Sequence, residues 1–211
     1  MAHASPLDHG VDTSPDAGYG TTLGIGHRKL LMWTFLASDC MFFGTLIANF
    51  MRYFSAQKGG PNPHELLNIP YTSVSAFVLL MSSLTMVLGL AAIQRGDEWG
   101  LRIWLGATAL LGTLFLGGQY FEFVEFYQHG MKLVGTNLFS SSFFLLTGFH
   151  GAHVTIGVIW LVSVIVVSFT KGITASQSMN VELAGLYWHF VDIIWIIVFT
   201  VVYLMGTTIR V

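Results

Sequence analysis

The sequence predicts an all-α fold, an integral membrane bundle of five transmembrane helices. Of its 211 residues, 54% are hydrophobic and only 9% are charged, whereas soluble domains carry about 25% charged residues. Five apolar runs reach the roughly 20 residues that a helix needs to cross a bilayer. Polar segments with Gly and Pro separate these runs. The expected organisation is a flexible polar tail at residues 1–28 and a membrane domain at residues 29–211 with spans at about 29–51, 71–94, 101–124, 137–169 and 183–208.

The first two spans differ in their polar content. Span 29–51 carries Asp39 about ten residues from its start, which places this acid near the bilayer middle at a rise of about 1.5 Å per residue. Residues 52–70 include G-G-P-N-P, a strong break. Span 71–94 has no charged residue, and its serines and threonines, Ser83 among them, suit close packing of helices.

The other three spans carry the remaining polar residues of interest. Span 101–124 ends in Q-Y-F-E-F-V-E, where Glu122 is a further candidate for a buried acid. Span 137–169 holds His150 and His153, and span 183–208 holds His189 and Asp192. Residues three apart share one face of a helix. We therefore expect each of these two pairs to point towards neighbouring helices.

Depth along the helices predicts that these polar residues meet. Asp39, the two histidines of span four, and His189 with Asp192 all lie within about 10 Å of the midplane. A mid-membrane carboxylate costs at least about 2.5 kcal/mol on insertion scales, so it should face protein and have a partner. The simplest arrangement is a polar seam among spans one, four and five. It would serve as a proton path, an ion pathway, a haem or metal site, or an interhelical hydrogen-bond network that fixes packing.

Charge and cysteine content narrow the classes of function. The net charge is −2, which gives no basic surface for nucleic acid. The single cysteine, Cys40, excludes an intrachain disulfide and a multi-cysteine metal site. Five spans place the two ends of the domain on opposite sides of the membrane. Five Lys and Arg residues on the N-terminal side against four on the other favour a cytoplasmic N-terminus.

Three sequence motifs lie in spans one, four and five. They are S-D-C-M-F-F-G-T in span one, F-F-L-L-T-G-F-H-G-A-H-V-T-I-G in span four and E-L-A-G-L-Y-W-H-F-V-D-I-I-W in span five. Together they closely resemble subunit III of the haem–copper terminal oxidases, over about residues 29–208. Members have seven spans, or five when the first two are absent, and this chain resembles the five-span bacterial form. The family usually has Glu at the position of Asp39, so the acid here is one methylene shorter.

The resemblance implies a non-catalytic subunit of a proton-pumping oxidase in aerobic respiration. In that family, subunit III binds no haem or copper, packs on subunit I, holds lipids and supports proton uptake and turnover during oxygen reduction. Haem and copper would then lie in partner subunits, and we expect bound phospholipid in this chain. The implied location is the bacterial inner membrane. The implied residues form a structural or proton-supporting network: Asp39, His150, His153, Glu182, His189 and Asp192.

The expected partners are oxidase subunits I and II, with a small subunit IV as a further candidate, and membrane lipids. An accessory subunit associated with nitric oxide reductase is an alternative that keeps the fold. A stand-alone transporter or membrane haem protein is the alternative from another class.

Overall fold

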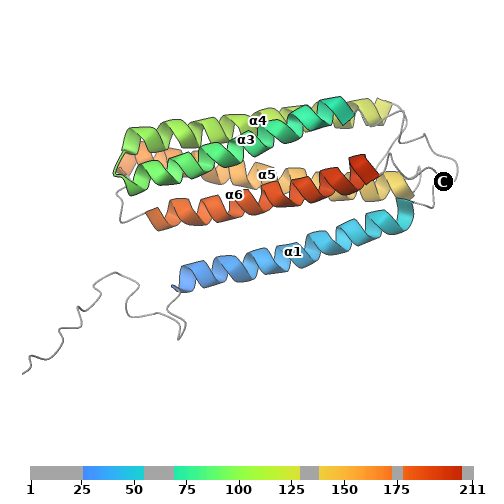
Figure 1. Cartoon of the computed structure of the whole chain (residues 1–211), viewed down its shortest axis with the longest axis horizontal. Helices are drawn as coiled ribbons and strands as arrows, with labels where there is room; N and C mark the ends of the chain where they lie inside the picture. Colours follow the sequence, from blue (N-terminus) through green and yellow to red (C-terminus); the bar gives the residue numbers. More distant parts are fainter. Residues whose placement is uncertain (1–25, 55–68, 129–137, 173–177, 206–211) are drawn as a thin grey trace, which may run out of the picture.

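The computed structural model describes residues 26–54, 69–128, 138–172 and 178–205, and these ranges form five long helices arranged as a bundle (Figure 1). All five are long and apolar enough to cross a membrane, which confirms the predicted fold class. The helices are α1 (His27–Phe54), α3 (Ile69–Gln94), α4 (Glu98–Gln128), α5 (Leu138–Lys171) and α6 (Ser178–Phe199). A π-helix, η2 (Thr200–Met205), continues α6.

The helices differ from the predicted spans mainly at their ends. Helix α1 begins at His27, so two residues of the expected tail are helical, while residues 1–25 lie outside the described part of the chain. Helix α6 begins at Ser178, five residues before the expected start of its span at residue 183. A helix can project beyond the apolar layer, because the hydrogen bonds of its backbone are satisfied internally on either side of the interface.

A tight turn joins α3 to α4, which form the most extensive helix pair of the bundle. Gly96 has a φ of 78°, a left-handed conformation that glycine adopts without steric cost. Asp97 then accepts a hydrogen bond from the backbone N–H of Gly100 at 2.8 Å, as an N-cap residue does. The turn is therefore a helix C-terminal cap followed at once by an N-cap.

One arginine ties the start of α4 to the end of α5. The Arg102 guanidinium donates to the hydroxyl and the backbone carbonyl of Ser168, each at 2.9 Å, and to Glu98 at 2.9 Å. Its planar group also lies 4.7 Å from the centre of the Phe169 ring. These bonds satisfy a carbonyl near the C-terminus of α5, where four carbonyls lack helical partners.

The centre of the core is the indole of Trp188 on α6, which is 1% exposed. A Cβ atom added at Gly112 of α4 would lie 2.6 Å from this ring, and one added at Gly157 of α5 would lie 2.8 Å from it. The indole N–H donates to Ser82 of α3 at 2.9 Å. Two glycines and a serine thus let three helices close around one aromatic side chain.

Helix α1 lies at the edge of the bundle, where it packs chiefly on α5 and α6 (Figure 1). Its outer face is apolar and uncovered in this chain, with Leu31 70% and Met41 76% exposed. Its inner face carries the buried Phe43 and Phe50. This arrangement places Asp39 of α1 against α5.

Candidate functional site

The ion-pair contact between α1 and α5 joins two of the predicted residues. Asp39 Oδ2 lies 3.2 Å from His153 Nε2, and each side chain is about 15% exposed. The Phe43 ring lies edge-on to the imidazole, with ring centres 5.0 Å apart. The pair is therefore largely shielded by apolar side chains, in a helix region expected to lie near the bilayer middle.

The hydrogen bond at Nδ1 of His153 shows which ring nitrogen carries a hydrogen. His153 Nδ1 lies 2.8 Å from the backbone carbonyl oxygen of Phe149, and a carbonyl oxygen can only accept. Nδ1 must therefore carry a hydrogen, and the Nε2 atom of a neutral ring has none. An attractive contact with Asp39 then requires one further proton, either on Nε2 or on the carboxyl group. Asp39 Oδ2 has no completed hydrogen bond within the described residues, so its contact with Nε2 is a close approach of the two groups.

A second pair links the N-terminal ends of α1 and α6. Lys29 Nζ lies 2.5 Å from Glu182 Oε1, and each side chain is 33% exposed. An ion pair of this exposure contributes about 0–1 kcal/mol. The pair joins the first turns of α1 and α6, about ten residues before Asp39 along α1.

His189 and Asp192 of α6 face α3. The Ser83 hydroxyl lies 2.6 Å from His189 Nδ1, and the same hydroxyl is a neighbour of the Asp192 carboxyl group. Asp192 is only 3% exposed, yet neither of its oxygens completes a hydrogen bond within the described part of the chain.

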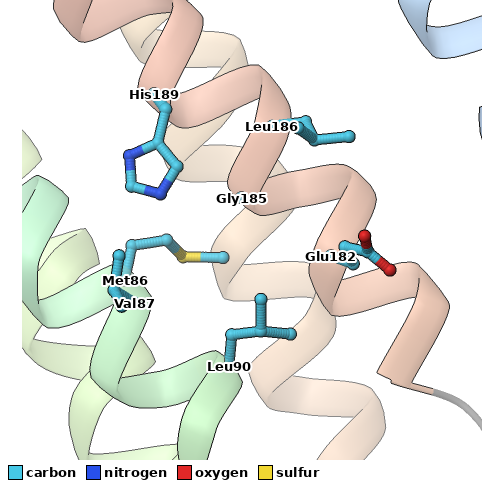
Figure 2. Close-up of a pocket in the computed structure, with 7 residues that line it drawn as sticks. All are labelled: Met86, Val87, Leu90, Glu182, Gly185, Leu186 and His189. Carbon is cyan, nitrogen blue, oxygen red and sulfur yellow. The ribbon is translucent and has the colours of Figure 1, made fainter.

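A groove between α3 and α6 exposes one side of the His189 side chain (Figure 2). The groove has a volume of about 160 Å³ and is lined by Met86, Val87, Leu90, Glu182, Gly185, Leu186 and His189. The imidazole of His189 points from α6 towards α3 at one end of it, whereas the Glu182 carboxylate turns away from α3 (Figure 2).

His150 is fully buried and lies apart from the acids. Its ring stacks on Trp195 of α6 at a centre-to-centre distance of 4.8 Å and meets the Phe115 ring of α4 edge-on at 5.9 Å. Neither ring nitrogen has a hydrogen-bond partner among the residues that the structure describes. His150 thus acts as an aromatic packing residue in this arrangement.

Glu122 is a buried acid at the far end of the bundle, 7% exposed. Its Oε1 accepts hydrogen bonds from Thr72 of α3 and Tyr203 of η2, each at 2.9 Å. Tyr203 lies in the π-helix η2, and π-helical turns inside α-helices frequently occur at functional sites. The three side chains connect α3, α4 and η2.

The predicted residues therefore form separate groups rather than one seam. Spans one and four meet through Asp39 and His153, and span five contributes Glu182 to the Lys29 pair. The expectation that His189 and Asp192 join this seam is wrong, because both face span two through Ser83. From the sequence, Ser83 was expected to be only a small packing residue. Its contact with His189 could not be predicted from spacing within one helix.

No group of three His, Cys, Asp or Glu side chains in residues 26–54, 69–128, 138–172 and 178–205 is placed to hold a metal ion. Carboxyl, imidazole and hydroxyl groups are present in pairs and short chains. Such arrangements can hold, share or pass protons, and they can fix helices to one another.

Known proteins of similar sequence share nearly the whole length of the chain. The model of the family described as cytochrome c oxidase subunit III matches residues 17–207. The quinol oxidase subunit 3 of Bacillus spizizenii is 38% identical over 207 residues, which cover 98% of this chain and 98% of that protein. The cytochrome c oxidase subunit 3 of Bacillus sp. is 36% identical, with 93% and 95% covered. The cytochrome bo(3) ubiquinol oxidase subunit 3 of Pseudomonas aeruginosa is 35% identical, with 98% and 95% covered.

Proposed function

The chain belongs to the cytochrome c oxidase subunit III family, and we propose that it packs on subunit I of a haem–copper oxidase, stabilises it and supports its proton uptake during oxygen reduction. Its membership confirms the resemblance that the sequence motifs indicated, and with it the role of an oxidase subunit III. The chain is a multi-pass membrane protein that associates with other oxidase subunits. The alternatives of a nitric oxide reductase accessory subunit and of a stand-alone transporter or haem protein are not favoured by these matches.

The observation that supports the proton role is the close approach of the Asp39 carboxyl group to the His153 imidazole. The pair lies between α1 and α5, and its two facing atoms are 3.2 Å apart. Because Nδ1 of His153 donates to Phe149, one added proton on Nε2 or on the carboxyl group would join the two side chains. An ionisable side chain inside a membrane span is energetically expensive, and such residues usually mark functional sites.

The proposed neighbours follow from the exposed surface and from the family. Subunit I, with subunit II and a small subunit IV, would cover part of the apolar faces, and phospholipid would cover the rest. The exposed side chains of α1, such as Leu31 and Met41, support such contacts. In this proposal, haem and copper stay in the partner subunits, and the complex lies in the bacterial inner membrane.

Exchange of Asp39 tests the proton role. We expect Asp39→Asn to leave the complex assembled but to shorten its active lifetime during turnover by about tenfold, which corresponds to about 1.4 kcal/mol in the barrier for losing activity. The amide cannot release a proton to His153, whereas Asp39→Glu keeps a carboxyl group and should keep most of the lifetime. Oxygen consumption of the purified complex over successive turnovers measures the effect.

Two controls separate this result from misassembly. Mass spectrometry should find this chain with its oxidase partners in each variant, and the haem absorption spectrum should be unchanged. Normal turnover and lifetime in Asp39→Asn would leave the pair with a packing role only.

A cytoplasmic N-terminus is the proposed orientation, supported by the slight excess of Lys and Arg on that side. On a Cys40→Ser background, cysteines at Gly10 and Gly60 lie on either side of α1 in the sequence. A membrane-impermeant thiol reagent added to intact cells should label Gly60→Cys alone, with Gly10→Cys labelled only after lysis. The reverse pattern would invert the orientation, and labelling of both from one side would contradict the crossing of α1.

A further inference from the structure

Asp192 is another buried acid of the bundle, and it takes no part in the Asp39–His153 pair. It is almost completely buried on the core face of α6, between Trp188 and Trp195. Both carboxyl oxygens remain without a completed hydrogen bond within the described residues. Buried polar atoms are nearly always satisfied, so each exception calls for a physical reason. An acid that gains and loses a proton is one such reason.

The groove between α3 and α6 offers a route for that proton. Its volume of about 160 Å³ is room for several waters, each of which takes about 30 Å³ in the liquid. His189 forms one end of the groove and is only partly buried. The groove thus has room for water beside a titratable side chain that lies one helical turn from Asp192.

One hydroxyl bridges the remaining gap. Ser83 Oγ lies 2.6 Å from His189 Nδ1 and is the polar neighbour of the Asp192 carboxyl. A serine hydroxyl can donate one hydrogen bond and accept two, and it rotates freely between partners. It can therefore accept a proton from the imidazole and donate its own to the carboxylate.

We propose that His189 and Ser83 form a proton relay that connects water in the α3–α6 groove with Asp192, a second proton-exchanging site in this chain. In the inward step, a hydronium ion in the groove gives a proton to His189 Nε2 and becomes water, and Nδ1 releases a proton to Ser83 Oγ. Ser83 passes its own hydrogen to an Asp192 oxygen. The imidazole ends neutral with its hydrogen on Nε2, the hydroxyl is restored, and the carboxylate becomes a neutral carboxylic acid. One proton has moved from the groove to the core.

The other titratable groups around α6 are engaged elsewhere and do not complete this path. Helices α1 and α5 contribute the Asp39–His153 pair, and α1 also contributes Lys29, which pairs with Glu182. Further groups among the described residues are His150 of α5, stacked on Trp195, and Glu122 of α4, bonded to Thr72 and Tyr203 of η2. Tyr187 of α6 donates to the backbone carbonyl of His153 at 2.9 Å.

Infrared spectroscopy of the purified oxidase complex can follow the Asp192 proton directly. The carbonyl stretch of a protonated carboxyl group that disappears in Asp192→Asn is assigned to Asp192. Transfer of the resting complex into deuterium oxide shifts this band as the proton exchanges. We expect Ser83→Ala to slow that exchange by roughly a hundredfold, the lower end of the effect of a positioned acid–base group. Ser83→Thr keeps a hydroxyl and should retain the rate.

Glu122 provides the matched control. It is also a buried acid with hydroxyl neighbours, but those neighbours are Thr72 and Tyr203 at the other end of the bundle. Its band, assigned by its loss in Glu122→Gln, should exchange at the same rate with and without Ser83→Ala. Slowing of both bands would indicate a general change in the bundle and would overturn the relay.

A second variant tests the groove without altering the relay. Val87 lines the groove and is 50% exposed, so Val87→Trp should fill the space and slow exchange at Asp192 while leaving Glu122 unchanged. Unchanged exchange in Val87→Trp, or the absence of an Asp192 carboxylic acid band at every pH, would overturn the proposal. Exchange is measured in the resting complex, so its outcome is independent of the turnover assays on Asp39.

Discussion

Replacement of Trp188 by alanine is expected to lower the free energy of unfolding of the bundle by about 3 kcal/mol or more, as for other large aromatic side chains removed from a core. Trp188 is 1% exposed and fills the space between Gly112 and Gly157. In a bilayer, helices associate mainly through close packing rather than exclusion of water. The cavity left at the junction of α3, α4, α5 and α6 therefore removes contacts that lipid cannot replace.

The thermal midpoint for loss of tertiary circular dichroism in detergent measures this effect. Trp99→Ala is the control, because Trp99 is 66% exposed and its main contact is Arg102, 5.7 Å from the ring centre. Loss of that exposed cation–π contact should cost only about 0.5–1 kcal/mol. Equal midpoints for the two alanine variants would contradict the central role of Trp188.

The five helices could be predicted because the membrane leaves few alternatives. A chain that crosses the apolar layer must satisfy its backbone hydrogen bonds within one segment, so each long apolar run becomes a helix. The turn at Gly96 likewise depends on a local signal, a glycine followed by an N-cap aspartate. The π-helix at Thr200–Met205 has no comparable signal in the sequence.

The partners of the polar residues were only partly predictable. Depth along a helix follows from the rise per residue, and it correctly brought Asp39 to the level of span four. The direction in which a side chain points around the helix axis is harder to predict, because residues three apart differ by about 60° at 3.6 residues per turn. This difference is enough to turn His153 towards Asp39 and His150 towards Trp195. The shared face of one helix therefore does not define a shared site.

The contacts of α3 were missed for a different reason. Serine and threonine in membrane helices often bond to carbonyls of their own helix, as Ser82 does with Leu79 at 2.5 Å. Such residues do not reveal from sequence which of them reach across to another helix. Ser83 and Thr72 do so because α6 and α4 present acids and a histidine at the same height.

Gly112→Leu is expected to destabilise the bundle by about 1–3 kcal/mol, the usual effect of forcing extra atoms into a packed core. A Cβ at this position would lie 2.6 Å from the Trp188 ring and 3.1 Å from Val158. Gly117→Leu on the same helix is the control, since no atom lies within 4 Å of a Cβ there. Both changes improve helix propensity by a similar amount, so the difference in thermal midpoint reports packing alone.

The double variant Gly112→Leu, Trp188→Ala tests whether the two positions act as one contact. The leucine side chain can enter the space that the indole leaves, so the double variant should be more stable than the sum of the two single losses predicts. We expect a coupling of roughly 0.5–3 kcal/mol, the range found for residues that share a cavity. Gly117→Leu combined with Trp188→Ala should be additive. Additive losses in both pairs would mean that Gly112 and Trp188 do not share a packing contact that matters for stability.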